Sequence, residues 1–162
     1  MMLIFKRSFL VLLLLILSVS ILGCTDHSDK ELIYDSEELQ MEVADSYTYS
    51  LRDDESENVV NQIDLSFRGF IGRDTIWTLV VSENTEIDFT YSSEIRSGQF
   101  KVILITPENE IHSVLSMSDQ GSDTVSFPQG TYYIKLIGKN AFGSISMNVE
   151  NVQNVTITKL EK

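Results

Sequence analysis

The sequence contains one cysteine, Cys24, and two histidines, His27 and His112, among its 162 residues. A single cysteine excludes an internal disulfide, so a folded domain here depends on its hydrophobic core. Zinc sites take three or four cysteine, histidine or carboxylate ligands, and two distant histidines do not supply them. Only His112 lies where it could be the base of a hydrolytic triad, and no Gly-x-Ser-x-Gly motif provides a nucleophile. We therefore predict a protein that is not an enzyme, with His112 on a strand surface.

Basic residues are also scarce, with 12 Lys and Arg against 24 Asp and Glu and a formal net charge of −12. Binding to nucleic-acid phosphates needs clustered Lys and Arg, and the sequence has no such cluster. This predicts that nucleic acid is not a partner. The acidic surplus is typical of a soluble surface, and it leaves cationic partners open.

An apolar run near the N-terminus is the clearest motif that the sequence does have. Lys6 and Arg7 precede it, and it covers residues 8–20. A membrane-spanning helix needs ~20 apolar residues, and this run is shorter. A basic start followed by a short apolar stretch is typical of a signal peptide. We predict that residues 1–23 are removed, which leaves a net charge of −14.

The end of this run, Ile21-Leu22-Gly23-Cys24, resembles the lipobox of bacterial lipoprotein precursors. The resemblance implies cleavage before Cys24, a diacylglyceryl group on its thiol, and a palmitate-type lipid anchor on the extracytoplasmic face of the cell membrane. Two acyl chains hold a protein stably in a bilayer, at ~0.8 kcal/mol per buried methylene. The alternative interpretation is an ordinary secretory signal that leaves Cys24 as a free thiol.

Two parts are predicted after the signal peptide. Residues 24–35 are polar and charged, with His27 among them, and predict a solvated tether that extends to at most ~40 Å. Residues 36–162 predict one domain, in which Ser36 is a candidate cap for a short helix. No repeat or second linker divides this domain.

Alternation of apolar and polar residues predicts half-buried strands, for instance at 63–67, 77–81 and 87–91. The apolar stretches 100–105 and 132–137 do not alternate, which is typical of strands covered on both faces. Polar turns separate the strands at even spacing. The sequence therefore predicts an all-β, antiparallel β-sandwich (jelly-roll-like) of about eight to ten strands.

Two stretches of the predicted domain resemble the bacterial pre-peptidase C-terminal domain and small lipoproteins with similar sandwiches. They are the apolar strand that ends in a Pro-Glu-Asn turn, residues 98–109, and the segment 128–136, which reads Pro-Gln-Gly-Thr-Tyr-Tyr-Ile-Lys-Leu. Some relatives bind calcium. The acidic residues that often precede the central strand in that family are replaced here by Gln99 and Lys101.

Candidate ligand sites are few. The acidic runs around Asp53 and Asp54 and around Asp119 and Asp123 offer oxygen ligands for calcium, but without the spacing of a known calcium loop, so solvated loops are the favoured interpretation. Four aromatic residues are candidates for a sugar-binding platform, although alternation favours core packing and sends the last two to opposite faces: Trp77, Tyr91, Tyr132 and Tyr133.

These observations predict a membrane-anchored extracytoplasmic lipoprotein that acts as a non-catalytic interaction or accessory module for another envelope protein. No cofactor is expected. The alternative is a calcium- or carbohydrate-binding β-sandwich module.

Overall fold

The computed structural model describes residues 26–160. The predicted signal peptide, the lipobox and Cys24 lie outside the described residues. Within residues 26–160, no helix is long and apolar enough to cross a membrane.

The described chain starts with three short helical elements, which differ from the predicted tether. They are α2 (Asp26–Leu32), the 3-10 helix η1 (Ile33–Asp35) and α3 (Glu37–Met41). The predicted cap is confirmed, because the backbone N–H of Leu39 donates to the Ser36 hydroxyl at 3.4 Å. Ile33 explains why the segment is ordered, since it is buried against the sheet and Tyr34, Leu39 and Met41 pack partly around it.

The rest of the described chain is an antiparallel sheet of eight strands, which confirms the predicted fold class. The strands are β1 (Ser46–Thr48), β2 (Leu51–Asp54), β3 (Gln62–Val81), β4 (Thr85–Ile105), β5 (Ile111–Ser116), β6 (Asp119–Phe127), β7 (Gly130–Glu150) and β8 (Val155–Lys159).

Three of these strands, β3, β4 and β7, are 20 or 21 residues long and bend sharply in the middle. The sequence predicts a turn between two separate strands at 63–67 and 77–81. This prediction is wrong, because both segments belong to β3. Gly69 and Gly72 adopt φ angles of 60° and 105°, and the pairing with β7 shifts register there. The glycines therefore form bulges that bend one continuous strand instead of reversing it. Gly98 and a register shift have the same effect in β4.

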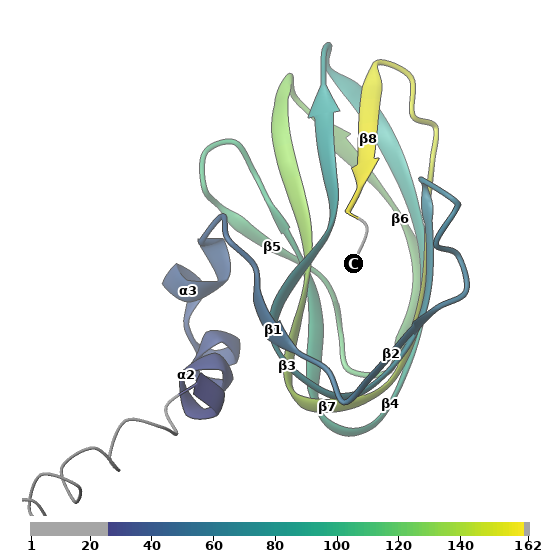
Figure 1. The fold of residues 1–162 in the computed structure, drawn as a ribbon. Coiled ribbons are helices and arrows are strands. Elements are labelled where there is room, and N and C mark those ends of the chain that lie inside the picture. Colours follow the sequence, from purple (N-terminus) through teal and green to yellow (C-terminus); the bar gives the residue numbers. More distant parts are fainter. Residues whose placement is uncertain (1–25, 161–162) are drawn as a thin grey trace, which may run out of the picture.

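The bends fold the sheet over itself into a sandwich of two layers (Figure 1). We call them the β6 layer and the β5 layer, after the strand at one edge of each. The β6 layer contains β2, residues 62–67 of β3, 143–150 of β7 and 85–95 of β4, and β6. The β5 layer contains β8 and β1, residues 70–81 of β3, 130–138 of β7 and 99–105 of β4, and β5.

Side chains from both layers form the main core. Phe67 of the β6 layer stacks on Phe100 of the β5 layer with ring centroids 4.9 Å apart, and Phe127 meets Tyr132 edge to face at 4.7 Å. A smaller cluster lies on the outer face of the β5 layer, where Ile103, Ile105 and Ile137 pack against residues of the N-terminal helices. This second cluster explains why 100–105 and 132–137 lack alternation, as the sequence predicts for strands covered on both faces.

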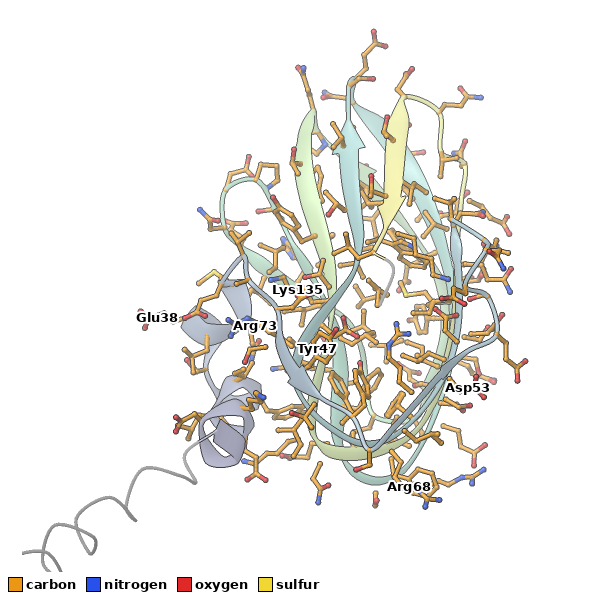
Figure 2. The ribbon with its side chains drawn as sticks, in the orientation of Figure 1. Glu38, Tyr47, Asp53, Arg68, Arg73 and Lys135 are labelled. Atoms are coloured by element: carbon orange, nitrogen blue, oxygen red, sulfur yellow. The ribbon has the colours of Figure 1, made fainter. Side chains whose placement is uncertain are left out.

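Polar contacts also attach the N-terminal segment to this outer face. The Arg73 guanidinium donates to the Ala44 carbonyl at 2.7 Å and pairs with the Glu42 carboxylate. The buried Lys135 ammonium donates to the Glu42 carbonyl at 2.5 Å. Figure 2 shows Arg73 and Lys135 on the side of the sheet that α3 covers. The helices are therefore part of the folded unit.

Candidate functional site

A cleft of about 500 Å³ lies between β5 and β6, the two strands at one edge of the sandwich. Each of these strands pairs with β4 and, within residues 26–160, with no other strand. The cleft therefore opens between the two layers, next to strand edges whose outward backbone groups face solvent.

The inside of the cleft is apolar because side chains of the main core line it. Val114 of β5 and Val125 of β6 are half-buried, whereas the others are buried. The full apolar lining is Phe89, Leu104, Val114, Val125, Phe127 and Tyr132. The hydroxyl of Tyr132 donates to the Pro128 carbonyl at 2.8 Å, so the polar group of this ring is satisfied.

Ser93 of β4 holds the connection between β5 and β6. Its buried hydroxyl donates to the Met117 carbonyl at 2.6 Å and accepts from the Asp119 N–H at 3.1 Å. Met117 has a φ of 60°, a conformation that fits a tight turn but is uncommon for a non-glycine residue. These contacts fix the turn between the two edge strands.

Charged residues at the mouth of the cleft are mainly acidic. Glu108 and Asp123 line it, together with His112, whose imidazole lies 3.9 Å from the exposed Glu110 carboxylate. Asp123 accepts a hydrogen bond from the Tyr91 hydroxyl at 3.1 Å. Partial burial and this hydrogen bond raise the pKa of Tyr91, which therefore stays a neutral donor at neutral pH.

The acidic residues of β6 lie on the same face of the strand as the residues that line the cleft. Residues 119, 121, 123, 125 and 127 share this face, because side chains alternate along a strand. The row changes from apolar, at Phe127 and Val125, to acidic, at Asp123 and Asp119. The sequence predicts a loop over 116–123, and this is wrong: most of that run belongs to β6, an exposed edge strand with few apolar residues.

The weak calcium candidates are not brought together. Asp53 lies exposed on β2, which pairs with β3, whereas β6 pairs with β4 at the other edge of the β6 layer. Asp54 is engaged by Ser56 and Lys159, and Asp119 caps the Gln120 N–H. In the described part of the chain, no group of three or more His, Cys, Asp and Glu residues could hold a metal ion.

The four candidate aromatic residues do not form an exposed platform. Trp77 and Tyr132 are buried in the main core. Tyr133 packs with the second cluster on the opposite face, as alternation predicts. Tyr91 is half-buried and bonded to Asp123.

The opposite edge of the sandwich is closed by buried charges. The Lys159 ammonium of β8 lies 3.3 Å from the Asp54 carboxylate and donates to the carbonyls of Ser56 at 2.5 Å and Gln62 at 2.9 Å. Burial alone would raise the pKa of Asp54, but hydrogen bonds from Ser56 and the charge of Lys159 lower it below the usual value. These bonds tie the edge of the β5 layer to that of the β6 layer.

The cleft itself was missed by sequence reasoning. It depends on which strands stand at the edge of each layer, and this follows from pairings between distant segments. The only local signal was the run of small and acidic residues in 119–124, which fits an exposed strand as well as a loop.

No protein-family model matches this sequence, and no curated protein matches it. Among solved structures, a CBM35 from Cellvibrio japonicus Abf62 is 10% identical, with 71% of this chain and 80% of that chain covered and a TM-score of 0.37. The carbohydrate-binding module CBM6cm-2 from Cellvibrio mixtus lichenase 5A, in complex with cellotriose, is 10% identical over 71% and 90% of the chains, with a TM-score of 0.37. A family 35 carbohydrate-binding module from an environmental isolate is 15% identical over 74% and 96%, with a TM-score of 0.36. Likenesses this distant assign no ligand to the present chain.

Proposed function

We propose that this chain is a lipid-anchored, non-catalytic interaction module of the bacterial cell envelope, and that it holds a partner protein in the cleft between β5 and β6. The observation that carries the proposal is the apolar cleft, which opens at a strand edge. Apolar side chains that line an open cleft gain free energy when a partner removes them from water.

A protein partner fits this cleft better than a small ligand does. Small-molecule sites combine an apolar pocket with a few convergent polar groups. Here the polar groups lie at the mouth, and none of the four candidate aromatic residues is exposed for stacking on a sugar. An edge strand offers backbone hydrogen bonds that another polypeptide can use.

The position of the N-terminal helices supports the anchoring part of the proposal. α2 begins at Asp26, two residues after Cys24, and η1 is tied to the bend of β7 by the Asp35–Lys139 pair at 2.6 Å. The cleft lies toward the start of β7, near Pro128 and Tyr132. A lipid on Cys24 would therefore hold the domain by one end and leave the cleft near the other.

The proposal is tested by purifying the tagged protein from its own membranes in mild detergent. We expect a stoichiometric partner with the wild type, and loss of both anchoring and partner with Cys24→Ala. Val125→Glu places a charge in the cleft and should remove the partner while leaving the protein in the membrane. Val80→Glu is the matched control, because Val80 is 45% exposed on β3 outside the cleft.

Thermal melting of both valine variants separates lost binding from lost folding, and Val114→Thr serves as a milder cleft variant if Val125→Glu melts early. A partner that stays bound to every cleft variant would disprove the role of the cleft. If the wild-type protein is extracted from the membrane without any partner, the accessory function is disproved.

A second candidate function, carbohydrate binding, is supported by a different surface. The outer face of the β6 layer has a shallow depression of about 300 Å³ with hydroxyl and carboxylate groups from three neighbouring strands and the loop after β2. Such groups are hydrogen-bond partners for sugars. Calorimetric titration with cell-wall polysaccharides tests this candidate, and heat that is lost in Ser146→Val but kept in Val125→Glu would favour it over the cleft.

A further inference from the structure

We infer that the cleft takes an extended segment of the partner as an additional β-strand along β6, and that this segment alternates so that apolar side chains followed by basic ones face the cleft. This inference rests on the proposed function and names the chemistry of the partner segment. It is carried by the open edge of β6, the apolar lining and the acidic residues that follow it in the same row.

The backbone of β6 is suited to accept a strand. β6 is nine residues long and pairs along its whole length with residues 85–93 of β4, which leaves its other edge unpaired by any strand in residues 26–160. Proteins usually shorten, bend or cover such edges because unpaired N–H and C=O groups are a template for another chain. The pairing of β6 with β4 has no register shift, so β6 offers a regular edge.

The side chains of β6 specify what the added strand should carry. Phe127 and Val125 lie at the apolar end of the row, with Val114 opposite on β5. Asp123, Gly121 and Asp119 follow at two-residue intervals, so a glycine separates the two carboxylates. Because an added strand has the same period of two, its cleft-facing residues should read apolar, apolar, basic, uncharged, basic in one direction along the chain, with the uncharged residue opposite Gly121.

Charge around the cleft also favours a cationic segment. Glu108 stands near the apolar end, and the protein as a whole carries a net charge of −12. The Lys and Arg residues of the described chain are engaged elsewhere, with Arg73 and Lys135 under the helices and Lys159 at the opposite edge. A basic partner segment would therefore be attracted from a distance and would meet no Lys or Arg among the residues that line the cleft, where His112 is accompanied by Glu108 and Asp123.

The experiment uses nine-residue fluorescent peptides as probes and measures anisotropy with the purified full chain. The first probe has valine, valine, lysine, threonine and lysine at positions 1, 3, 5, 7 and 9 and threonine at the others, and the second has this order reversed because the direction of the added strand is open. Two control probes replace lysine by glutamate or carry N-methyl groups on the backbone nitrogens that would pair with β6.

We expect one of the two cationic probes to bind at least tenfold more tightly than the glutamate probe, and N-methylation to abolish its binding. Asp123→Asn keeps the acceptor for Tyr91 and removes the charge, so it should weaken binding about tenfold, which corresponds to about 1.4 kcal/mol. Asp53→Asn, an exposed acidic position on β2, is the matched control and should leave binding unchanged.

Equal binding of the lysine and glutamate probes would overturn the charge preference, and equal binding of the N-methylated probe would overturn strand addition. Failure of all probes would overturn the inference as a whole, while a partner captured in detergent and lost in Val125→Glu would still support the proposed function. Sedimentation of the wild type, with and without the cationic probes, shows whether the chain forms a dimer. A dimer that the probes do not dissociate would overturn the inference and assign the edge of β6 to a second copy of the chain.

Discussion

Asp54 and Lys159 show how single charged residues hold one side of this sandwich together. Both side chains are almost fully buried, with 6% and 9% exposed. The partners of the lysine, Asp54, Ser56 and Gln62, come from the end of β2, the connecting loop and the start of β3. The attraction between two buried charges offsets the free energy of their desolvation only while both charges are present. Removing one partner therefore leaves the other buried without compensation.

The first prediction concerns Asp54→Asn and the pH dependence of stability. The folded-state pKa of Asp54 lies below its unfolded value of about 3.9, so its contribution is complete above that pH and is lost as the pH falls through the folded pKa. We expect the variant to be about 3 kcal/mol less stable at pH 7, and the difference to narrow below pH 4.

Urea denaturation at pH 7, 5 and 3.5 measures this difference, with Asp53→Asn as the neighbouring control that should match the wild type at all three values. A deficit in Asp54→Asn that stays the same from pH 7 to pH 3.5 would contradict the assigned pKa shift.

At the scale of elements, the segment α2–η1–α3 protects an apolar face of the sheet. Ile33 packs against the second cluster, and the Gln40 amide donates to the carbonyls of Ile33 and Tyr34, each at 2.8 Å. Without this cover, Ile103, Ile105 and Ile137 would face water. The helices are too short to be stable alone, so these contacts hold them in place.

The second prediction compares Ile33→Ala with Leu32→Ala. Ile33 is 3% exposed and Leu32 is 59% exposed, although they are adjacent. We expect Ile33→Ala to lower the free energy of unfolding by about 2–4 kcal/mol because it leaves a cavity, and Leu32→Ala to change it by less than about 0.5 kcal/mol. Denaturant unfolding measures both, and equal effects would show that the cover does not pack as described.

The elements also show what the sequence could and could not predict. The alternation of apolar and polar residues located the strands around Ile63–Phe67 and Ile87–Phe89, because one face of each strand packs in the core and the other faces solvent. It could not tell the bend at Gly69 and Gly72 from a turn, since glycine with positive φ serves both, and the outcome depends on pairing with distant β7. The tether prediction differed from the structure because the polar composition of residues 24–35 hides the apolar residues Ile33 and Tyr34, which pack against the sheet.

The site was less predictable than the fold for the same reason. The residues that line the cleft belong to strands that are neighbours only after folding. Asp123, which lies at the mouth, belongs to a part of β6 that reads as a polar loop in the sequence. Alternation is a local signal, so it could predict that Tyr132 and Tyr133 lie on opposite faces, but it could not tell which of them enters the main core.

At the scale of the whole molecule, the described helices leave little free chain between the sandwich and the predicted lipid. η1 is bonded next to the bend of β7 through Lys139, and β7 runs from there to Gly130 over a length of roughly 30 Å for an extended strand. An anchored domain should therefore keep a fixed end near the bilayer.

The third prediction tests this arrangement with the lipidated protein in vesicles. A fluorophore attached through Asp29→Cys should transfer energy strongly to an acceptor dye in the lipid headgroups, whereas one attached through Gln129→Cys, in the loop before β7, should transfer little. Equal strong transfer would mean that the domain lies flat, and equal weak transfer would favour the extended tether that the sequence predicts.

The three bent strands also determine when the protein can fold. β3, β4 and β7 each run through both layers, and Gln62 at the start of β3 pairs with Asn148 near the end of β7. Neither layer can therefore be completed before almost the whole chain is present. Folds whose contacts join distant residues fold slowly, on timescales of about milliseconds to seconds. A chain delivered across a membrane from its N-terminus would remain without a core until β7 emerged, and the helices after residue 25 would wait, unfolded, for the sheet face on which they pack.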